Sequence, residues 1–141
     1  MLKQNIPNFI TLGNLLCGTL AINAIYSNDL IIASWLIALA ALLDFADGFV
    51  ARILKVSSPM GKELDSLADM VTFGLVPALL MLKLFPDQTS TYKFGMLVIA
   101  LAAAWRLAKF NIDTRQSDSF LVLPSPANAL FIGAIPLIFV Q

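Results

Sequence analysis

Apolar residues fill five segments of the chain, and short polar stretches separate them. The segments cover residues 9–26, 30–54, 65–85, 93–112 and 126–140. A helix needs about 20 residues to cross roughly 30 Å of hydrocarbon, so the first four segments can span a membrane when their polar ends lie in the interface. The fifth segment would be about 22 Å long at the helical rise. The pattern therefore predicts an all-α, multi-pass membrane helix bundle.

Composition agrees with a membrane protein. Hydrophobic residues make up 59% of the 141 positions and charged residues 13%, with a mean hydropathy of +0.84, whereas soluble domains carry about 25% charged residues. The formal net charge is zero, and like charges form no run, so we expect no nucleic acid partner. The one cysteine, Cys17, is expected to be a small buried side chain rather than a reactive thiol. The N-terminal stretch has no cleavage pattern, so we expect no signal peptide.

Basic residues between the segments set the expected orientation. With the N-terminus in the cytoplasm, only Lys83 and Lys93 fall on the outer side. The cytoplasmic regions then hold Lys3, Arg52, Lys55, Lys62, Arg106, Lys109 and Arg115. Cytoplasmic loops carry an excess of Lys and Arg. We therefore expect an integral protein of the cytoplasmic (inner) membrane with its N-terminus inside.

Four carboxylates lie at the predicted cytoplasmic ends of the second and third apolar segments. Asp44 and Asp47 are three residues apart, and Asp65 and Asp69 are four apart, so the members of each pair share one face of a helix. An ionisable residue at a bilayer boundary costs a few kcal/mol unless it is paired, hydrated or bound to a metal. We expect the two pairs to meet across a loop over residues 55–64 and to form a functional site open to the cytoplasm.

The residues around the aspartates indicate the chemistry of this site. Four like charges repel one another unless a cation neutralises them. Carboxylate oxygens without His or Cys suit hard ions such as Mg2+, Mn2+ or Ca2+ rather than zinc. Gly48 and Ala51 continue the face of the first pair with little or no side chain, which leaves room for a ligand. Arg52 adds a fixed cation of the kind that holds phosphate oxygens.

These residues form a known signature. The pattern Asp-x2-Asp-Gly-x2-Ala-Arg-x8-Gly-x3-Asp-x3-Asp resembles that of the CDP-alcohol phosphotransferases. Its fixed positions are all filled, by Asp44, Asp47, Gly48, Ala51, Arg52, Gly61, Asp65 and Asp69. Three stretches, at residues 7–18, 65–78 and 106–111, resemble the phosphatidylserine synthase branch of that family. The resemblance covers nearly the whole chain, so we expect residues 1–141 to belong to a single membrane domain.

The resemblance implies a transferase of phospholipid biosynthesis. Such an enzyme moves the phosphatidyl group of CDP-diacylglycerol to an alcohol and releases CMP, and in this branch the alcohol is L-serine. The implied cofactor is Mg2+ or Mn2+, and its implied ligands are Asp44, Asp47, Asp65 and Asp69. Asp69 is also the implied catalytic base that takes the proton from the acceptor hydroxyl. The residues implied to bind CDP are Asn8, Thr11, Asp44, Gly48, Ala51, Arg52, Gly61 and Lys62. Those implied to bind the acceptor or the lipid phosphate are Arg106, Lys109 and Asn111.

The resemblance also bears on how much of the domain this chain contains. The family core has six helices, so we expect this chain to be incomplete at its C-terminal end, within or after the fifth helix. A lipid-facing groove or dimer contact built from the sixth helix would then be missing, and the polypeptide would be inactive if that part is required. The resemblance implies surrounding membrane lipid and is compatible with a homodimer.

Other functions stay open on the residues alone. Glycerol 3-phosphate or an inositol phosphate as acceptor would require basic residues to pair with a second phosphate, and no Arg or Lys stands between Gln4 and Asn28. A cation channel or transporter could also line a path with aspartates, but these would recur near the bilayer midplane. A purely structural membrane subunit is a third alternative.

Several polar residues outside the signature allow two readings. Asn8, Thr11 and Asn14 are spaced along one helix face and predict either interhelical hydrogen bonds or, from the resemblance, a nucleotide-contacting strip. The basic residues of 106–111 also fit anchors that snorkel to the interface. Ser66 is expected to make a local hydrogen bond. Residues 73–77, with Gly74 and Pro77, are expected to kink or tightly pack the third helix.

Overall fold

The computed structural model describes residues 2–85, 90–112 and 125–139, and every regular element in these ranges is a helix. Within these ranges, three stretches are long and apolar enough to cross a membrane: Asn5–Tyr26, Leu30–Leu54 and Pro59–Leu84. Large apolar side chains such as Trp35 and Trp105 are exposed, as expected for helices that face lipid. The chain is therefore a helical membrane protein. The predicted membrane crossing at residues 93–112 stays a prediction.

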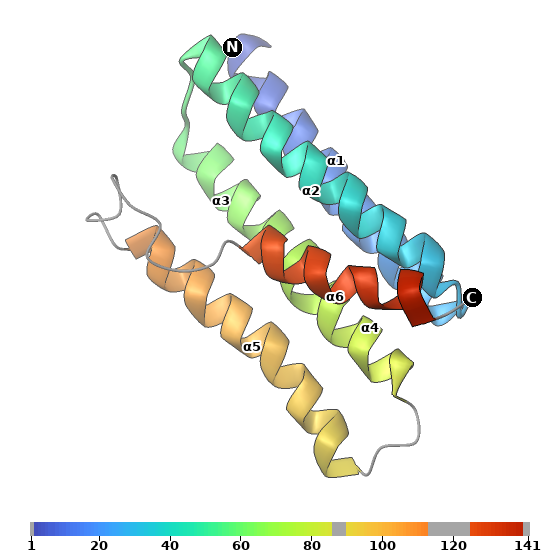
Figure 1. Ribbon diagram of the computed structural model, residues 1–141. Helices are drawn as coiled ribbons and strands as arrows, with labels where there is room; N and C mark the ends of the chain where they lie inside the picture. The colour runs from blue at the N-terminus through green and yellow to red at the C-terminus, as the bar shows by residue number, and fades with distance from the viewer. Residues whose placement is uncertain (1, 86–89, 113–124, 140–141) are drawn as a thin grey trace.

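Two long antiparallel helices, α1 (Leu2–Tyr26) and α2 (Leu30–Leu54), pack along their length (Figure 1). A tight turn joins them, in which Asn28 adopts the left-handed conformation with φ of 63°. The Asp29 N–H donates to the carbonyl oxygen of Ala24. The start of α1 and the end of α2 consequently lie at the same end of the molecule.

The third rod of the bundle consists of α3 (Pro59–Asp69), η1 (Met70–Leu75) and α4 (Val76–Leu84). It begins six residues before the predicted apolar segment, so the loop after α2 is shorter than the sequence predicts. The cause is local: the hydroxyl oxygen of Ser58 accepts a hydrogen bond from the Gly61 N–H at 2.9 Å, and Pro59 has the φ of a first helical turn. This cap starts α3 after only four residues that follow the end of α2, and α3 packs against α1.

A π-helical stretch, η1, interrupts the rod directly after Asp69. Its wider turns hold Thr72, Phe73 and Gly74 in buried positions. A Cβ atom added at Gly18 of α1 would lie 2.5 Å from the Thr72 hydroxyl oxygen, and one added at Gly74 would lie 3.0 Å from the Cβ of Ala103. The tight packing predicted around residues 73–77 is confirmed, and neighbours on both sides hold η1.

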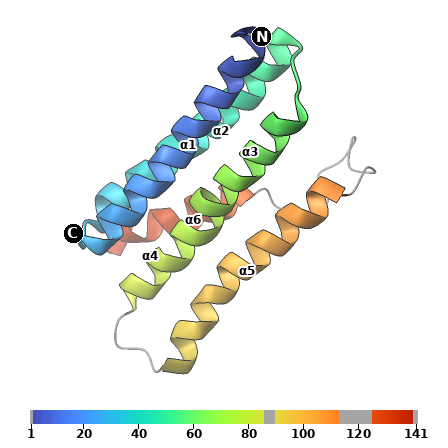
Figure 2. The same ribbon diagram turned by 180° about the vertical axis from the view of Figure 1, so that it is seen from behind.

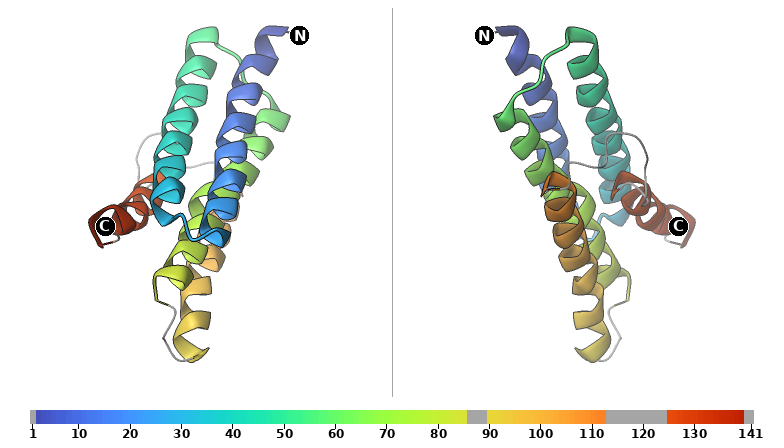
Figure 3. Two further views of the ribbon diagram at one scale, coloured as in Figure 1. Left: turned by 90° about the vertical axis from the view of Figure 1, so that its right-hand side faces the viewer. Right: turned by 90° about the vertical axis from the view of Figure 1, so that its left-hand side faces the viewer.

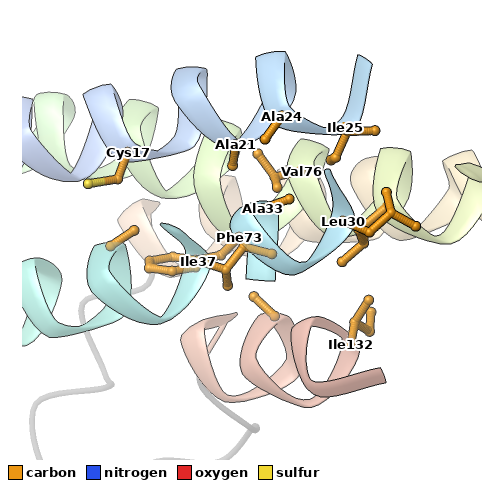
Figure 4. Close-up of a cluster of buried hydrophobic side chains, with 13 residues drawn as sticks. Cys17, Ala21, Ala24, Ile25, Leu30, Ala33, Ile37, Phe73, Val76 and Ile132 are labelled. Atoms are coloured by element: carbon orange, nitrogen blue, oxygen red, sulfur yellow. The ribbon is translucent and has the colours of Figure 1, made fainter. Parts of the chain in front are cut away.

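The last two helices, α5 (Ser90–Ile112) and α6 (Ser125–Phe139), complete the described bundle. α5 runs beside η1 and α4, whereas α6 packs against α2 and α4 (Figures 2 and 3). The hydrophobic core lies between α1, α2, η1, α4 and α6, and Figure 4 shows part of it. It includes Cys17, which is buried as predicted, and Ile37, Phe73, Val76 and Ile132.

Candidate functional site

Three carboxylates from two helices converge at the end of the molecule where α1 begins. Asp44 and Asp47 lie three residues apart on α2, and Asp65 lies on α3, which starts after the turn that closes α2. One oxygen atom of each carboxylate lies within 4.8 Å of the others. Three oxygens at this separation form a ligand set that a hard divalent ion can use. The predicted meeting of the two half-sites is therefore seen in the geometry.

Asp69, the fourth predicted carboxylate, lies one turn further along α3. Its side chain is next to that of Asp44. The amide nitrogen of Asn14 donates to its Oδ1 at 3.4 Å. All four aspartates are thus neighbours, but Asp69 stands beside the group of three rather than within it.

Helix α1 supplies neutral hydrogen-bond donors to the carboxylates. The Thr11 hydroxyl donates to Oδ2 of Asp47 at 2.6 Å, and Asn14 donates to Asp69 as described. Both side chains are buried, with 4% of Thr11 and 0% of Asn14 exposed. Because the two residues are three apart, they lie on one face of α1. Interhelical hydrogen bonding is therefore confirmed for these two residues, and their partners are the site itself.

A pocket of about 250 Å³ opens beside the carboxylates. It is lined by residues of α1, α2 and the start of α3. Six of the residues predicted to bind CDP line it: Asn8, Thr11, Gly48, Ala51, Gly61 and Lys62. Four lining residues were not predicted from the sequence: Pro7, Val56, Ser57 and Ser58. Only Ser58 has a sequence signal, because a serine directly before a proline is typical of a helix cap.

Two glycines of the signature do different things at this pocket. A Cβ atom added at Gly48 would meet nothing within 4 Å, so this position leaves open space, as predicted. One added at Gly61 would lie 2.9 Å from Oδ1 of Asn8, so Gly61 allows α3 to approach α1. The two remaining predicted CDP ligands are outside the lining. Asp44 belongs to the carboxylate group, and the Arg52 side chain is exposed.

The three residues predicted to bind the acceptor or the lipid phosphate have different surroundings, and their predicted role stays a prediction. Arg106 lines a separate, largely apolar pocket of about 330 Å³ between η1, α5 and α6. Lys109 is exposed. Asn111 is hydrogen bonded to Ser66, with its Nδ2 donating to the serine hydroxyl oxygen at 2.8 Å. Ser66 makes the predicted local hydrogen bond, to the carbonyl oxygen of Lys62 at 3.1 Å, and the contact with Asn111 was not predicted.

Comparison with known proteins accounts for this combination of helices and carboxylates. Residues 4–141 match the sequence model of the CDP-alcohol phosphatidyltransferases. The chain belongs to this family. CDP-diacylglycerol–serine O-phosphatidyltransferase of Bacillus subtilis is 38% identical over 127 residues, which cover 86% of this chain and 69% of the relative.

Two further relatives carry the same name. The protein of Helicobacter pylori strain J99 is 39% identical over 131 residues, covering 89% of this chain and 54% of the relative. The protein of Methanocaldococcus jannaschii is 35% identical over 127 residues, covering 90% of this chain and 58% of the relative. This phosphatidyltransferase chain therefore spans little more than half the length of several relatives that it matches.

Proposed function

We propose that this CDP-alcohol phosphatidyltransferase transfers the phosphatidyl group of CDP-diacylglycerol to L-serine and releases CMP. The observation that carries the proposal is the convergence of Asp44, Asp47 and Asp65 beside a pocket that the family signature lines. The names of the relatives support serine as the acceptor. The absence of Lys and Arg between Gln4 and Asn28 also supports an acceptor without a second phosphate.

A divalent cation, Mg2+ or Mn2+, is the proposed cofactor. Asp44, Asp47 and Asp65 would hold it, because their converging oxygens are the hard ligands that these ions prefer. Asp69, next to Asp44, is a further candidate ligand. When bound, such a cation neutralises charge on the phosphate oxygens during phosphoryl transfer.

The remaining residues have proposed roles in holding the substrates. The CDP moiety would occupy the pocket between α1, α2 and α3, with Asn8 and Lys62 as polar contacts and Gly48 as open floor. Asp69 would accept the proton of the acceptor hydroxyl, since Asn14 fixes one of its oxygens. The phosphate contact predicted for Arg52 stays a prediction, because its side chain is exposed and lies outside the pocket lining.

The site is proposed to face the cytoplasm from the inner membrane. Arg52, Lys55 and Lys62 lie at the end of the molecule that holds the carboxylates. Lys83 lies in the last turn of α4, at the far end of the third rod. This distribution follows the positive-inside rule. The side chains of Lys3 and Lys93, and the whole of Arg115, fall outside the part of the chain that the structure describes. A homodimer, and the extent of the complete domain, stay predictions.

The proposed function is tested with the purified protein in lipid nanodiscs that contain CDP-diacylglycerol. L-serine, glycerol 3-phosphate and inositol phosphate are supplied together, each with a different label, in the presence of Mn2+. Phosphatidylserine is the expected lipid product, in an amount that matches the CMP released. Phosphatidylglycerol phosphate as the main product would refute serine as the acceptor, and no CMP release with any acceptor would refute transferase activity of this chain.

A further inference from the structure

The hydrogen bonds between α5 and the rest of the described chain converge on Asn111. Its Nδ2 donates to the Ser66 hydroxyl oxygen at 2.8 Å, and its Oδ1 lies 3.2 Å from the same oxygen. Its main-chain carbonyl oxygen accepts a hydrogen bond from the Lys62 ammonium at 3.2 Å. The described residues show no other hydrogen bond from α5 to another helix. One residue therefore makes the polar connection between α5 and α3.

The carbonyl of Asn111 is a favourable partner for a lysine. It belongs to the last turn of α5, which ends at Ile112, and carbonyls in a last turn have no partner within the helix. The helix dipole also places partial negative charge there, which attracts a cation. Lys62 and Ser66 are four residues apart, so they present one face of α3 to this helix end.

The adjacent side of the same turns of α3 contributes to the active site. Gly61 approaches Asn8 of α1, and Asp65 contributes an oxygen to the carboxylate group. Gly61 directly precedes Lys62 in the chain, and Asp65 directly precedes Ser66. A shift of α3 away from α5 would therefore move Asp65 relative to the carboxylates of α2.

We propose that the contact of Ser66 and Lys62 with Asn111, here called the Asn111 clasp, positions Asp65 for cation binding. Asn111 is then a positioning residue and not a ligand of the acceptor, because its amide is already paired with Ser66. The inference rests on the proposed function only in taking the carboxylate group as the cation site. Residues that orient metal ligands from outside the coordination shell change affinity or activity by about 10- to 100-fold when they are mutated.

The test measures Mn2+ affinity of the full chain in nanodiscs, together with thermal unfolding of the metal-free protein. Ser66→Ala removes the hydroxyl, Asn111→Leu removes the amide at similar volume, and the double variant removes both. Ser34→Ala is the matched control, since its hydroxyl donates to the carbonyl oxygen of Leu30 in its own helix and the described part of the chain shows no interhelical partner for it. Ser66→Thr, which keeps the hydroxyl, is the conservative variant.

Each single variant is expected to weaken Mn2+ binding by about tenfold. The double variant should be no weaker than the worse single variant, because both remove the same contact. Ser66→Thr should keep most of the affinity, and Ser34→Ala should equal the parent protein. In the metal-free protein, the two single changes in melting temperature should likewise not add.

Two results would overturn the proposal. Unchanged Mn2+ affinity with a raised acceptor KM in Asn111→Leu alone would make Asn111 an acceptor ligand, as the sequence predicts. Additive losses from Ser66→Ala and Asn111→Leu would mean that the two residues act separately. Mn2+ binding needs neither CDP-diacylglycerol nor serine, so it can be measured without the transfer reaction. If the variants show the expected Mn2+ affinities but the protein transfers no phosphatidyl group, the proposed function is overturned and the proposal for the Asn111 clasp stands.

Discussion

Replacing Thr11 by valine removes a buried hydroxyl that bonds to Asp47 of the site and also lies 3.0 Å from the Pro7 carbonyl oxygen in its own helix. The Thr11 hydroxyl lies 2.6 Å from Oδ2 of Asp47, and only 4% of the residue is exposed. Valine has nearly the same shape, so the change removes the donor without opening a cavity. A hydrogen bond to a charged group contributes about 1.5–3 kcal/mol. Part of this loss will appear in the metal-free fold, and the part that concerns the orientation of Asp47 will appear as weaker cation binding.

We expect Thr11→Val to lower Mn2+ affinity by about tenfold, which corresponds to about 1.4 kcal/mol of binding free energy. A Mn2+ titration of the protein in nanodiscs gives the affinity, and thermal unfolding with and without Mn2+ gives the effect on the fold. Thr19→Val is the matched control, because Thr19 lies on α1 and its hydroxyl bonds to the Leu16 carbonyl oxygen within that helix. Equal Mn2+ affinities for the Thr11 and Thr19 variants would refute an orienting role for Thr11.

Three further outcomes are expected. Asp65→Asn should abolish CMP release and leave membrane insertion and thermal stability unchanged. Asp29→Asn is the control, because Asp29 is an exposed aspartate at the α1–α2 turn. Full activity of the Asp65 variant at limiting Mn2+ would exclude Asp65 from the cation site. Chelation should stop the reaction and thiol alkylation should not, since Cys17 is buried among apolar side chains; inactivation that follows alkylation of Cys17 would contradict this. Gly18→Ala should destabilise the fold by about 1–3 kcal/mol, because its Cβ would lie 2.5 Å from the Thr72 hydroxyl oxygen. Gly13→Ala is the control, since its Cβ would make only an ordinary contact of 3.4 Å. Equal melting temperatures for the two variants would show that α1 and η1 separate at low cost.

The sequence by itself determined the elements and the composition of the site. Long apolar segments in a chain with 13% charged residues must be helices in lipid, because no other open structure satisfies its backbone there. The three-residue spacing of Asp44 and Asp47 is enough to put both on one helix face. Five residues of the signature line the pocket: Asp47, Gly48, Ala51, Gly61 and Asp65. These inferences succeed because they depend on the helical period and on residues near one another in the chain.

Only the tertiary structure decided which side chains meet. Thr11 and Asp47 are 36 residues apart, and Ser66 and Asn111 are 45 apart, so neither pair has a local signal. Arg106 and Asn111 are close in sequence and were predicted to share a site, yet one lines the pocket beside α6 and the other is bound to α3. Interhelical contacts of this kind depend on the fit of whole surfaces, which hydropathy and spacing along one segment do not encode.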